Sequence, residues 1–161
     1  MRILITGTES TGKSTLAKRL SAHLGIAWIP EYARTYLEVH GPSYKASDLL
    51  SIAQEQHNLV PIDDQAFILD TYLLNIKIWS EEKYGRCDPW ITDTLAQASF
   101  DRVLLTAPDL PWIQDDLREN PTAADRLHQR FVSELNDLGW PYAIISGQGQ
   151  QRLHSALAAI K

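Results

Sequence analysis

The chain has 161 residues with 15 basic and 20 acidic side chains, a net charge of −5 that argues against a general nucleic-acid binder. Hydrophobic residues make up 44% and charged residues 22%, which excludes disordered and fibrous classes and suits one domain over 1–161. The single cysteine, Cys87, excludes an internal disulfide, and no apolar run approaches the roughly 20 residues of a spanning helix. We therefore expect a cytoplasmic protein that does not enter a membrane.

Short apolar runs alternate with amphipathic segments along the chain. The runs predict strands, which we place at 2–6, 26–29, 66–69, 102–106 and 142–145. Apolar residues at helical spacing predict helices, which we place at 13–25, 31–39, 71–84, 127–139 and 153–160, with one more that Ser47 caps. Strands alternating with helices predict a three-layer α/β fold with a parallel sheet of about five strands. Functional groups in such folds gather at the carboxyl ends of the strands.

The segment Gly7–Ser14 matches the phosphate-binding pattern G-x-x-x-x-G-K-[ST] at every fixed position, between a predicted strand and a predicted helix. Its backbone amides and the positive end of the helix form a cradle for phosphate oxygens. We expect Lys13 to contact the β- and γ-phosphates, the Ser14 hydroxyl to bind Mg²⁺ and Thr15 to reach the α-phosphate. The residues expected to bind ATP here are Gly7, Thr8, Glu9, Ser10, Thr11, Gly12, Lys13, Ser14 and Thr15.

Two further residues are placed for nucleotide binding. Asp70 closes the third predicted strand, where a carboxylate that helps to hold Mg²⁺ is expected. Its alternative role is to cap the helix that follows, since Asp is favoured at that position. After the fifth strand, the turn Gly147-Gln148-Gly149 offers Gln148 as an adenine contact.

Three classes of nucleotide-binding protein carry this phosphate-binding pattern and are the alternatives considered. A GTPase would carry an Asn/Thr-Lys-x-Asp segment, which the chain lacks, and a motor-type ATPase would follow its strand with Asp-Glu, whereas Asp70 is followed by Thr71. A small-molecule kinase needs a base, an acceptor pocket and a basic lid. Glu31, directly after the second strand, is the expected base, with Asp70 as its rival. Arg34, one turn later, pairs with Glu31 or contacts a phosphate.

The lid is expected at about 108–126, a Pro-rich polar segment after the fourth strand. Arg118 and Arg126 would offset the charge that develops on the transferred phosphoryl group. The alternative is a solvated helix with surface arginines. Trp112 lies in the same segment and is expected to stack on a heteroaromatic acceptor, with Tyr32 or Tyr72 framing the ring.

These elements together resemble the ribosylnicotinamide kinase domain of NadR-type proteins. The resemblance covers nearly the whole chain and rests on Gly7–Thr15, Pro30–Arg34, Asp70-Thr71, Trp79-Ser80-Glu81, Tyr84–Cys87 with Pro89-Trp90, and Pro111–Asp115 followed by Leu117-Arg118. It implies a fold like that of thymidylate and deoxynucleoside kinases. It also implies ATP-dependent phosphorylation of the 5′-hydroxyl of nicotinamide riboside to nicotinamide mononucleotide. Gln114 and Asp115 are then expected among the residues that bind the substrate.

NadR-type proteins commonly carry an adenylyltransferase domain ahead of the kinase. This chain shows no His-x-Gly-His nucleotidyl-transfer signature, so we expect no adenylyl transfer and no DNA regulation, unless the chain is an excised fragment. Two alternatives stay open. One is a kinase for another nucleoside or a nucleoside monophosphate, and the other is an ATP-binding regulatory module with little turnover. The expected partner is a small-molecule nucleoside, with no nucleic acid or membrane, and association into homo-oligomers is left open.

Overall fold

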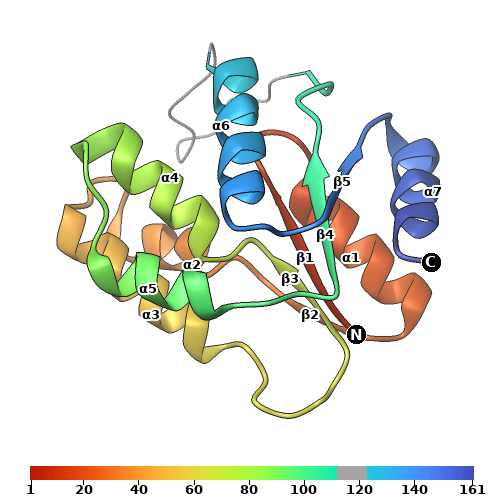
Figure 1. The fold of residues 1–161 in the computed structure, drawn as a ribbon, viewed down its shortest axis with the longest axis horizontal. Coiled ribbons are helices and arrows are strands. Elements are labelled where there is room, and N and C mark those ends of the chain that lie inside the picture. The colour runs from red at the N-terminus through yellow and green to blue at the C-terminus, as the bar shows by residue number, and fades with distance from the viewer. Residues whose placement is uncertain (112–122) are drawn as a thin grey trace.

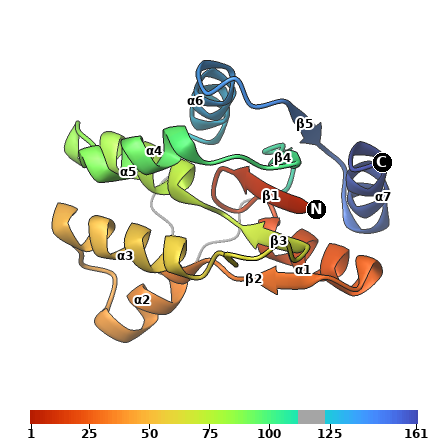
Figure 2. The same cartoon turned by 60° about the horizontal axis from the view of Figure 1, so that its bottom comes forward.

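The computed structural model describes residues 1–111 and 123–161. Five strands form one sheet, and every pair of neighbouring strands is parallel. In chain order they are β1 (Arg2–Gly7), β2 (Ala27–Ile29), β3 (Phe67–Asp70), β4 (Arg102–Thr106) and β5 (Tyr142–Ile145). Across the sheet the order is β2-β3-β1-β4-β5, which Figure 2 shows from one edge to the other. The expected parallel sheet of about five strands is therefore confirmed.

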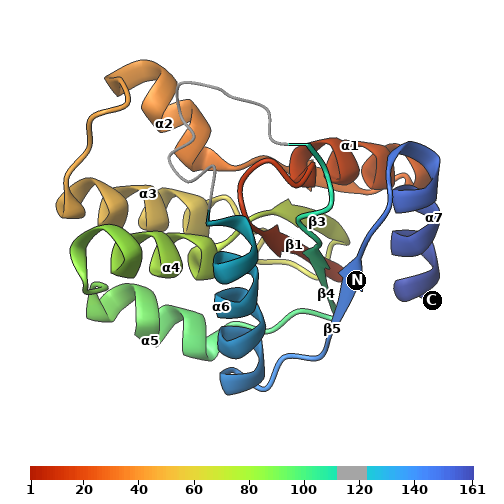
Figure 3. The same cartoon turned by 90° about the horizontal axis from the view of Figure 1, so that it is seen from above.

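Helices cover both faces of this sheet, as Figures 1 and 3 show. They are α1 (Lys13–Leu24), α2 (Tyr32–His40), α3 (Ala46–Asn58), α4 (Leu73–Tyr84), α5 (Pro89–Gln97), α6 (Ala124–Asp137) and α7 (Gly149–Ala159). The side chains of α1 and α7 pack on one face, while α2 to α6 pack on the other. Alternation along β1 explains the two layers, because Ile3 and Ile5 face α1 and Leu4 faces the larger group. All three side chains are fully buried.

Three local expectations were wrong. The helix assigned to Ser47 begins at Ala46, where the Asp48 carboxylate accepts the Lys45 backbone N–H at 2.7 Å. The helix expected from residue 71 begins at Leu73, because Thr71 has a φ of 68° that an α-helix does not allow. Its cap is Tyr72, so the capping role considered for Asp70 does not hold.

Helix α5 was not predicted from the sequence. Its start carries a recognisable signal, because the Asp88 side chain accepts the backbone N–H of Trp90 at 2.9 Å and Pro89 occupies the first turn. Ile91 and Leu95 bury the inner face of this helix in the core that α4 also lines. None of the helices in the described ranges is long and apolar enough to cross a membrane.

Candidate active site

The loop between β1 and α1 is shaped by positions where only small residues fit. Gly7 has a φ of 138°, and a Cβ there would collide with the Thr106 hydroxyl. Gly12 has a φ of 74° and is the N-cap residue of α1. Because it has no side chain, no capping group occupies the first N–H groups of the helix. A Cβ on Gly12 would lie 3.0 Å from the Leu110 side chain. These conformations turn the chain into a concave backbone loop ahead of a helix N-terminus, which is an arrangement that binds phosphate.

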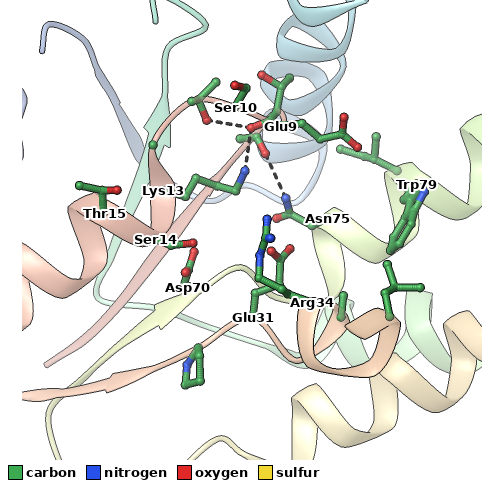
Figure 4. Close-up of a pocket in the computed structure, with 18 of the residues that line it drawn as sticks. Glu9, Ser10, Lys13, Ser14, Thr15, Glu31, Arg34, Asp70, Asn75 and Trp79 are labelled. Carbon is green, nitrogen blue, oxygen red and sulfur yellow. Dashed lines mark hydrogen bonds between the residues drawn. The ribbon is translucent and has the colours of Figure 1, made fainter. Parts of the chain in front are cut away.

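Side-chain hydrogen bonds brace this loop. The Thr11 hydroxyl lies 2.8 Å from the Thr8 carbonyl and 2.7 Å from the Thr106 hydroxyl. The Lys13 ammonium donates to the Thr8 carbonyl at 2.7 Å (Figure 4). Asn75 of α4 donates from Nδ2 to the Gly7 carbonyl at 3.1 Å and accepts the Thr6 hydroxyl at 2.6 Å. The loop is thus held from β4 and from α4 at once.

A buried arginine supports the loop from the other side. Arg152 of α7 is 4% exposed and donates to the Thr11 carbonyl at 3.1 Å and to the Gly147 carbonyl at 2.7 Å. It also pairs with Asp109, whose other carboxylate oxygen accepts the Gly147 N–H at 2.6 Å. The phosphate loop, the segment after β4 and the segment after β5 are therefore tied together through one guanidinium group.

Asp70 lies at the carboxyl end of β3, next to the start of α1. Its carboxyl group is fully buried, and neither oxygen makes a hydrogen bond within the described part of the chain. Figure 4 shows the Ser14 hydroxyl pointing toward it. Burial, followed by the charge of Glu31, raises the pKa of Asp70 to about 6. The nearby Ser14 hydroxyl and the positive charges of Lys13 and Arg34 act in the opposite direction and lower this pKa.

This pair of side chains fits a magnesium ion. A carboxylate with two unsatisfied oxygens beside a hydroxyl offers the hard oxygen donors that Mg²⁺ takes. Within residues 1–111 and 123–161 there is no group of three or more His, Cys, Asp and Glu residues that could hold a metal. Mg²⁺ is commonly bound through one or two protein groups together with substrate phosphates, and Ser14 and Asp70 beside the phosphate loop fit such a donor set.

Glu31 lies between the end of β2 and the start of α2, facing the same space. Its carboxylate accepts the Thr71 hydroxyl at 3.3 Å, and its charge acts on Asp70. Arg34 extends from the first turn of α2 beside it (Figure 4). The structure therefore brings together four residues that the sequence singled out, namely Lys13, Glu31, Arg34 and Asp70.

One cavity of about 470 Å³ connects these groups. All nine residues from Gly7 to Thr15 line it at one end. At the other end α2, α4 and α6 contribute mainly apolar side chains, which are Ala33, Leu37, Ile78, Trp79, Leu127 and Phe131. Glu31 lines the cavity between the loop and this apolar end, and Glu38 and Glu82 add carboxylates to the lining. The site thus has a phosphate end and an apolar, aromatic end.

Several expected site residues lie elsewhere. Tyr72 is 3% exposed and packs against Phe100 and His57, with its hydroxyl 2.7 Å from the His57 ring nitrogen. Burial raises its pKa to about 12. Tyr32 packs against Tyr36. Neither tyrosine lines the cavity, so the structure does not place them where an acceptor ring would stack.

Gln148 and Arg126 are also outside the cavity lining. Gln148 is the exposed N-cap residue of α7. Arg126 forms a two-pronged ion pair with Glu82 at 2.9 and 2.5 Å, which holds its guanidinium on the outer surface between α6 and α4. The remaining expected residues lie outside the described part of the chain, and they are Trp112, Gln114, Asp115 and Arg118.

Trp79 and Asn75 are among the lining residues that were not expected at the site. Trp79 belongs to a helix that is apolar on most faces, so the pattern gave no sign of which face meets the cavity. Asn75 lies one turn earlier on the same helix. An amide among the apolar residues at the start of this helix was the available signal for it, because buried amides need partners, and the partners here are Thr6 and Gly7 at the end of β1.

Comparison with known proteins adds relatives over most of the chain. Residues 2–152 match a family described as an AAA domain (AAA_28). The trifunctional NAD biosynthesis/regulator proteins NadR of Salmonella typhimurium and Escherichia coli are each 26% identical over 132 residues. These matches cover 77% of this chain and 32% of each relative, so the chain spans about a third of the length of these curated relatives.

Solved structures share the fold. A NadR protein in complex with NR superposes with a TM-score of 0.76 at 21% identity, covering 99% of this chain and 50% of that one. A NadR protein with NAD and AMP-PNP gives 0.79 at 22%, covering 99% and 48%. A deoxyadenosine kinase from M. mycoides with bound dCTP gives 0.65 at 15%, covering 98% and 97%. The expected likeness to nucleoside kinases in fold is therefore confirmed.

Proposed function

Since the chain belongs to the AAA_28 family of P-loop domains, we propose that it is an ATP-dependent kinase that phosphorylates the 5′-hydroxyl of nicotinamide riboside. The observation that carries this proposal is the two-ended cavity, with a phosphate loop at one end and an aromatic pocket at the other. Glu31 lies between the two ends, where a hydroxyl group would meet a terminal phosphate. The similarity to the NAD biosynthesis/regulator protein NadR, and to a NadR protein in complex with NR, supports the choice of nucleoside.

The phosphate loop binds the triphosphate of ATP. Backbone N–H groups of the loop and the N-terminus of α1 contact the phosphate oxygens, and the Lys13 ammonium leaves the Thr8 carbonyl to pair with them. Such preorganised donors stabilise charge that develops in phosphoryl transfer without having to reorient.

Ser14 and Asp70 are the residues that would hold Mg²⁺, as their chemistry and burial allow. A bound Mg²⁺ neutralises charge on the phosphates and helps to orient them. Asp70, whose pKa of about 6 leaves a fraction of it protonated near neutral pH, would be held in its ionised form when it binds the metal.

Glu31 acts as the base. It orients the nucleoside hydroxyl toward the terminal phosphate and accepts the proton as the new P–O bond forms and the bond to ADP breaks. Asp70 is less suited to this role, because it is fully buried beside Ser14 and is needed for the metal.

The aromatic end selects the base of the nucleoside. Trp79 offers a ring face, and a pyridinium cation over such a face gains about 0.5–2 kcal/mol. Glu38 adds a carboxylate to the same lining, which favours a cationic ring over the neutral bases of ordinary nucleosides, whereas the charge of Glu82 is paired with Arg126. A kinase for another nucleoside is the second candidate, which the fold shared with deoxyadenosine kinase favours.

The test is a nucleoside panel. The protein is incubated with Mg-ATP and with nicotinamide riboside, adenosine, deoxyadenosine, cytidine or uridine, and ADP release and product mass are followed. We expect ADP release that depends on nicotinamide riboside and a product heavier by one phosphate. Release with a neutral nucleoside alone would move the assignment to the second candidate. Release without any nucleoside would indicate an ATPase and overturn the kinase proposal.

A further inference from the structure

Glu31 lies outside regular secondary structure. It precedes the first residue of α2, with backbone angles of φ −67° and ψ 111°, and its side chain caps no N–H group of that helix. The carboxylate is therefore free to face the cavity. A residue at such a bend needs other groups to fix its backbone and its side chain, since neither a helix nor a strand does so.

Gln56 of α3 fixes the backbone on both sides of Glu31. This residue is 1% exposed, and its Oε1 accepts the Tyr32 N–H at 2.7 Å while its Nε2 donates to the Pro30 carbonyl at 3.4 Å. One buried amide thus bonds the residues immediately before and after Glu31. The other buried side chains of α3 are apolar, and burying an amide among them costs free energy unless it is hydrogen-bonded, which these two contacts provide.

Thr71 fixes the side chain. It follows Asp70 directly, is 3% exposed and has a φ of 68°, a conformation that a β-branched residue rarely adopts. Its N–H bonds to the Ile5 carbonyl at 3.0 Å, which anchors this conformation to the sheet. In that position its hydroxyl donates to the Glu31 carboxylate at 3.3 Å. Strained backbone of this kind concentrates at functional sites.

We propose that Gln56 and Thr71 are positioning residues for phosphoryl transfer, and that together they hold the Glu31 carboxylate beside Asp70 and facing the phosphate loop. Gln56 sets where the backbone of Glu31 lies, and Thr71 sets where its carboxylate points. Neither residue lines the cavity, so both act through Glu31. This inference rests on the proposed function, because it assumes that Glu31 is the base.

A positioning role differs measurably from a merely structural one. Displacing a base by about 1 Å can lower kcat about 100-fold, while the phosphate loop and its affinity for ATP stay as they are. A residue that matters only for stability lowers the melting temperature and leaves the kcat of the folded fraction unchanged.

The experiment uses two matched pairs of variants. Thr71→Val keeps the shape but removes the hydroxyl, and Thr71→Ser keeps the hydroxyl. Gln56→Met removes both hydrogen bonds at similar volume, and Gln56→Glu keeps the acceptor for the Tyr32 N–H. Gln54→Met, on an exposed face of the same helix, is the control. Initial rates with nicotinamide riboside and Mg-ATP give kcat and both KM values, and a fluorescent ATP analogue gives the nucleotide affinity.

We expect kcat to fall about 10- to 100-fold in Thr71→Val and Gln56→Met, with the KM for ATP and the nucleotide affinity within about twofold of wild type. The kcat of Thr71→Ser should stay within about threefold of wild type, and the kcat of Gln56→Glu should lie between those of wild type and Gln56→Met. If Gln56→Met does not fold, the threonine pair alone decides. An active wild type whose kcat survives in Thr71→Val would overturn this inference and leave the kinase intact. A wild type without nucleoside-dependent activity would overturn both.

Discussion

Asp70→Asn tests the electrostatics of the site without needing any substrate. The carboxyl group is fully buried without a hydrogen bond from the described residues, and its pKa is raised from 3.8 to about 6. The unfolded chain therefore loses this proton at a lower pH than the folded protein does. As pH rises between these two values, the unfolded state is favoured, so the ionised carboxylate destabilises the folded protein at neutral pH and above.

The magnitude follows from the size of the rise. An increase from 3.8 to about 6 corresponds to about 3 kcal/mol, at 1.36 kcal/mol for each tenfold change in the ionisation constant. The amide that replaces the carboxyl group is neutral at every pH, so Asp70→Asn should unfold with a free energy up to about 3 kcal/mol higher than wild type at pH 8. The difference should shrink as pH falls through 6 and vanish below about 4, where Asp70 is protonated in both states.

Urea unfolding followed by tryptophan fluorescence, from pH 4 to 8 without nucleotide or metal, measures this difference. Asp93→Asn, on an exposed part of α5, is the matched control and should follow the wild-type curve. A second arm adds ATP with Mg²⁺ or with EDTA. For wild type, the free energy of unfolding should be higher with ATP and Mg²⁺ than with ATP and EDTA. For Asp70→Asn the two values should be equal, and the variant should be inactive. An Asp70→Asn protein that is no more stable than wild type at pH 8, or whose advantage does not change with pH, would refute this reasoning.

Three other substitutions probe the loop, the acceptor end and the outer surface. Gly7→Ala should lower the free energy of unfolding by about 1–3 kcal/mol and abolish ATP binding, because the new Cβ would collide with Thr106 at a φ of 138°. The control is Gly139→Ala, at a φ of 66° with open space around it, which should still bind ATP when both variants are titrated with the nucleotide. Trp79→Ala should raise the KM for nicotinamide riboside about 2- to 30-fold and leave that for ATP unchanged, and equal KM values for the nucleoside would exclude stacking. Arg126→Ala breaks an ion pair whose arginine side chain is 61% exposed, so its urea unfolding curve should overlay that of wild type. A large fall in its kcat would show instead that this arginine reaches the phosphates during transfer.

The layer structure and the phosphate loop could be predicted from sequence because both rest on local patterns. Short apolar strands of three to six residues and most of the helices leave a periodic signal in the sequence. The phosphate loop can be recognised in the sequence because its backbone passes too close to other groups for a side chain, as at Gly7 beside Thr106. The positions of Glu31 and Asp70 followed from one topological rule, that parallel strands end at a common edge.

The acceptor end could not be predicted in the same way, because it depends on which face of each helix meets the cavity. Nothing in a helix that is apolar on most faces separates Trp79, which lines the cavity, from the residues that pack into the core. Tyr72 was one of two tyrosines expected to frame the acceptor ring. The positive φ of Thr71 turns the chain there and sends the Tyr72 ring into the core instead.

The residues that hold the loops of the site in place could not be predicted from the sequence either. Gln56 bonds to Tyr32, Asn75 to Gly7 and Arg152 to Thr11, and these partners are 24 to 141 residues away in the chain. No local pattern carries such contacts. Only the folded arrangement brings these side chains to the loops that they hold.

The most direct test of this account is a crystal structure with Mg²⁺, a non-hydrolysable ATP analogue and nicotinamide riboside bound together. The triphosphate should lie in the loop that Gly7 and Gly12 shape, with the nicotinamide ring against Trp79. The 5′-hydroxyl should lie within about 2.6–3.2 Å of the Glu31 carboxylate and should face the terminal phosphate. A nucleoside bound outside this cavity, or a Glu31 carboxylate that faces away from the hydroxyl, would contradict the account.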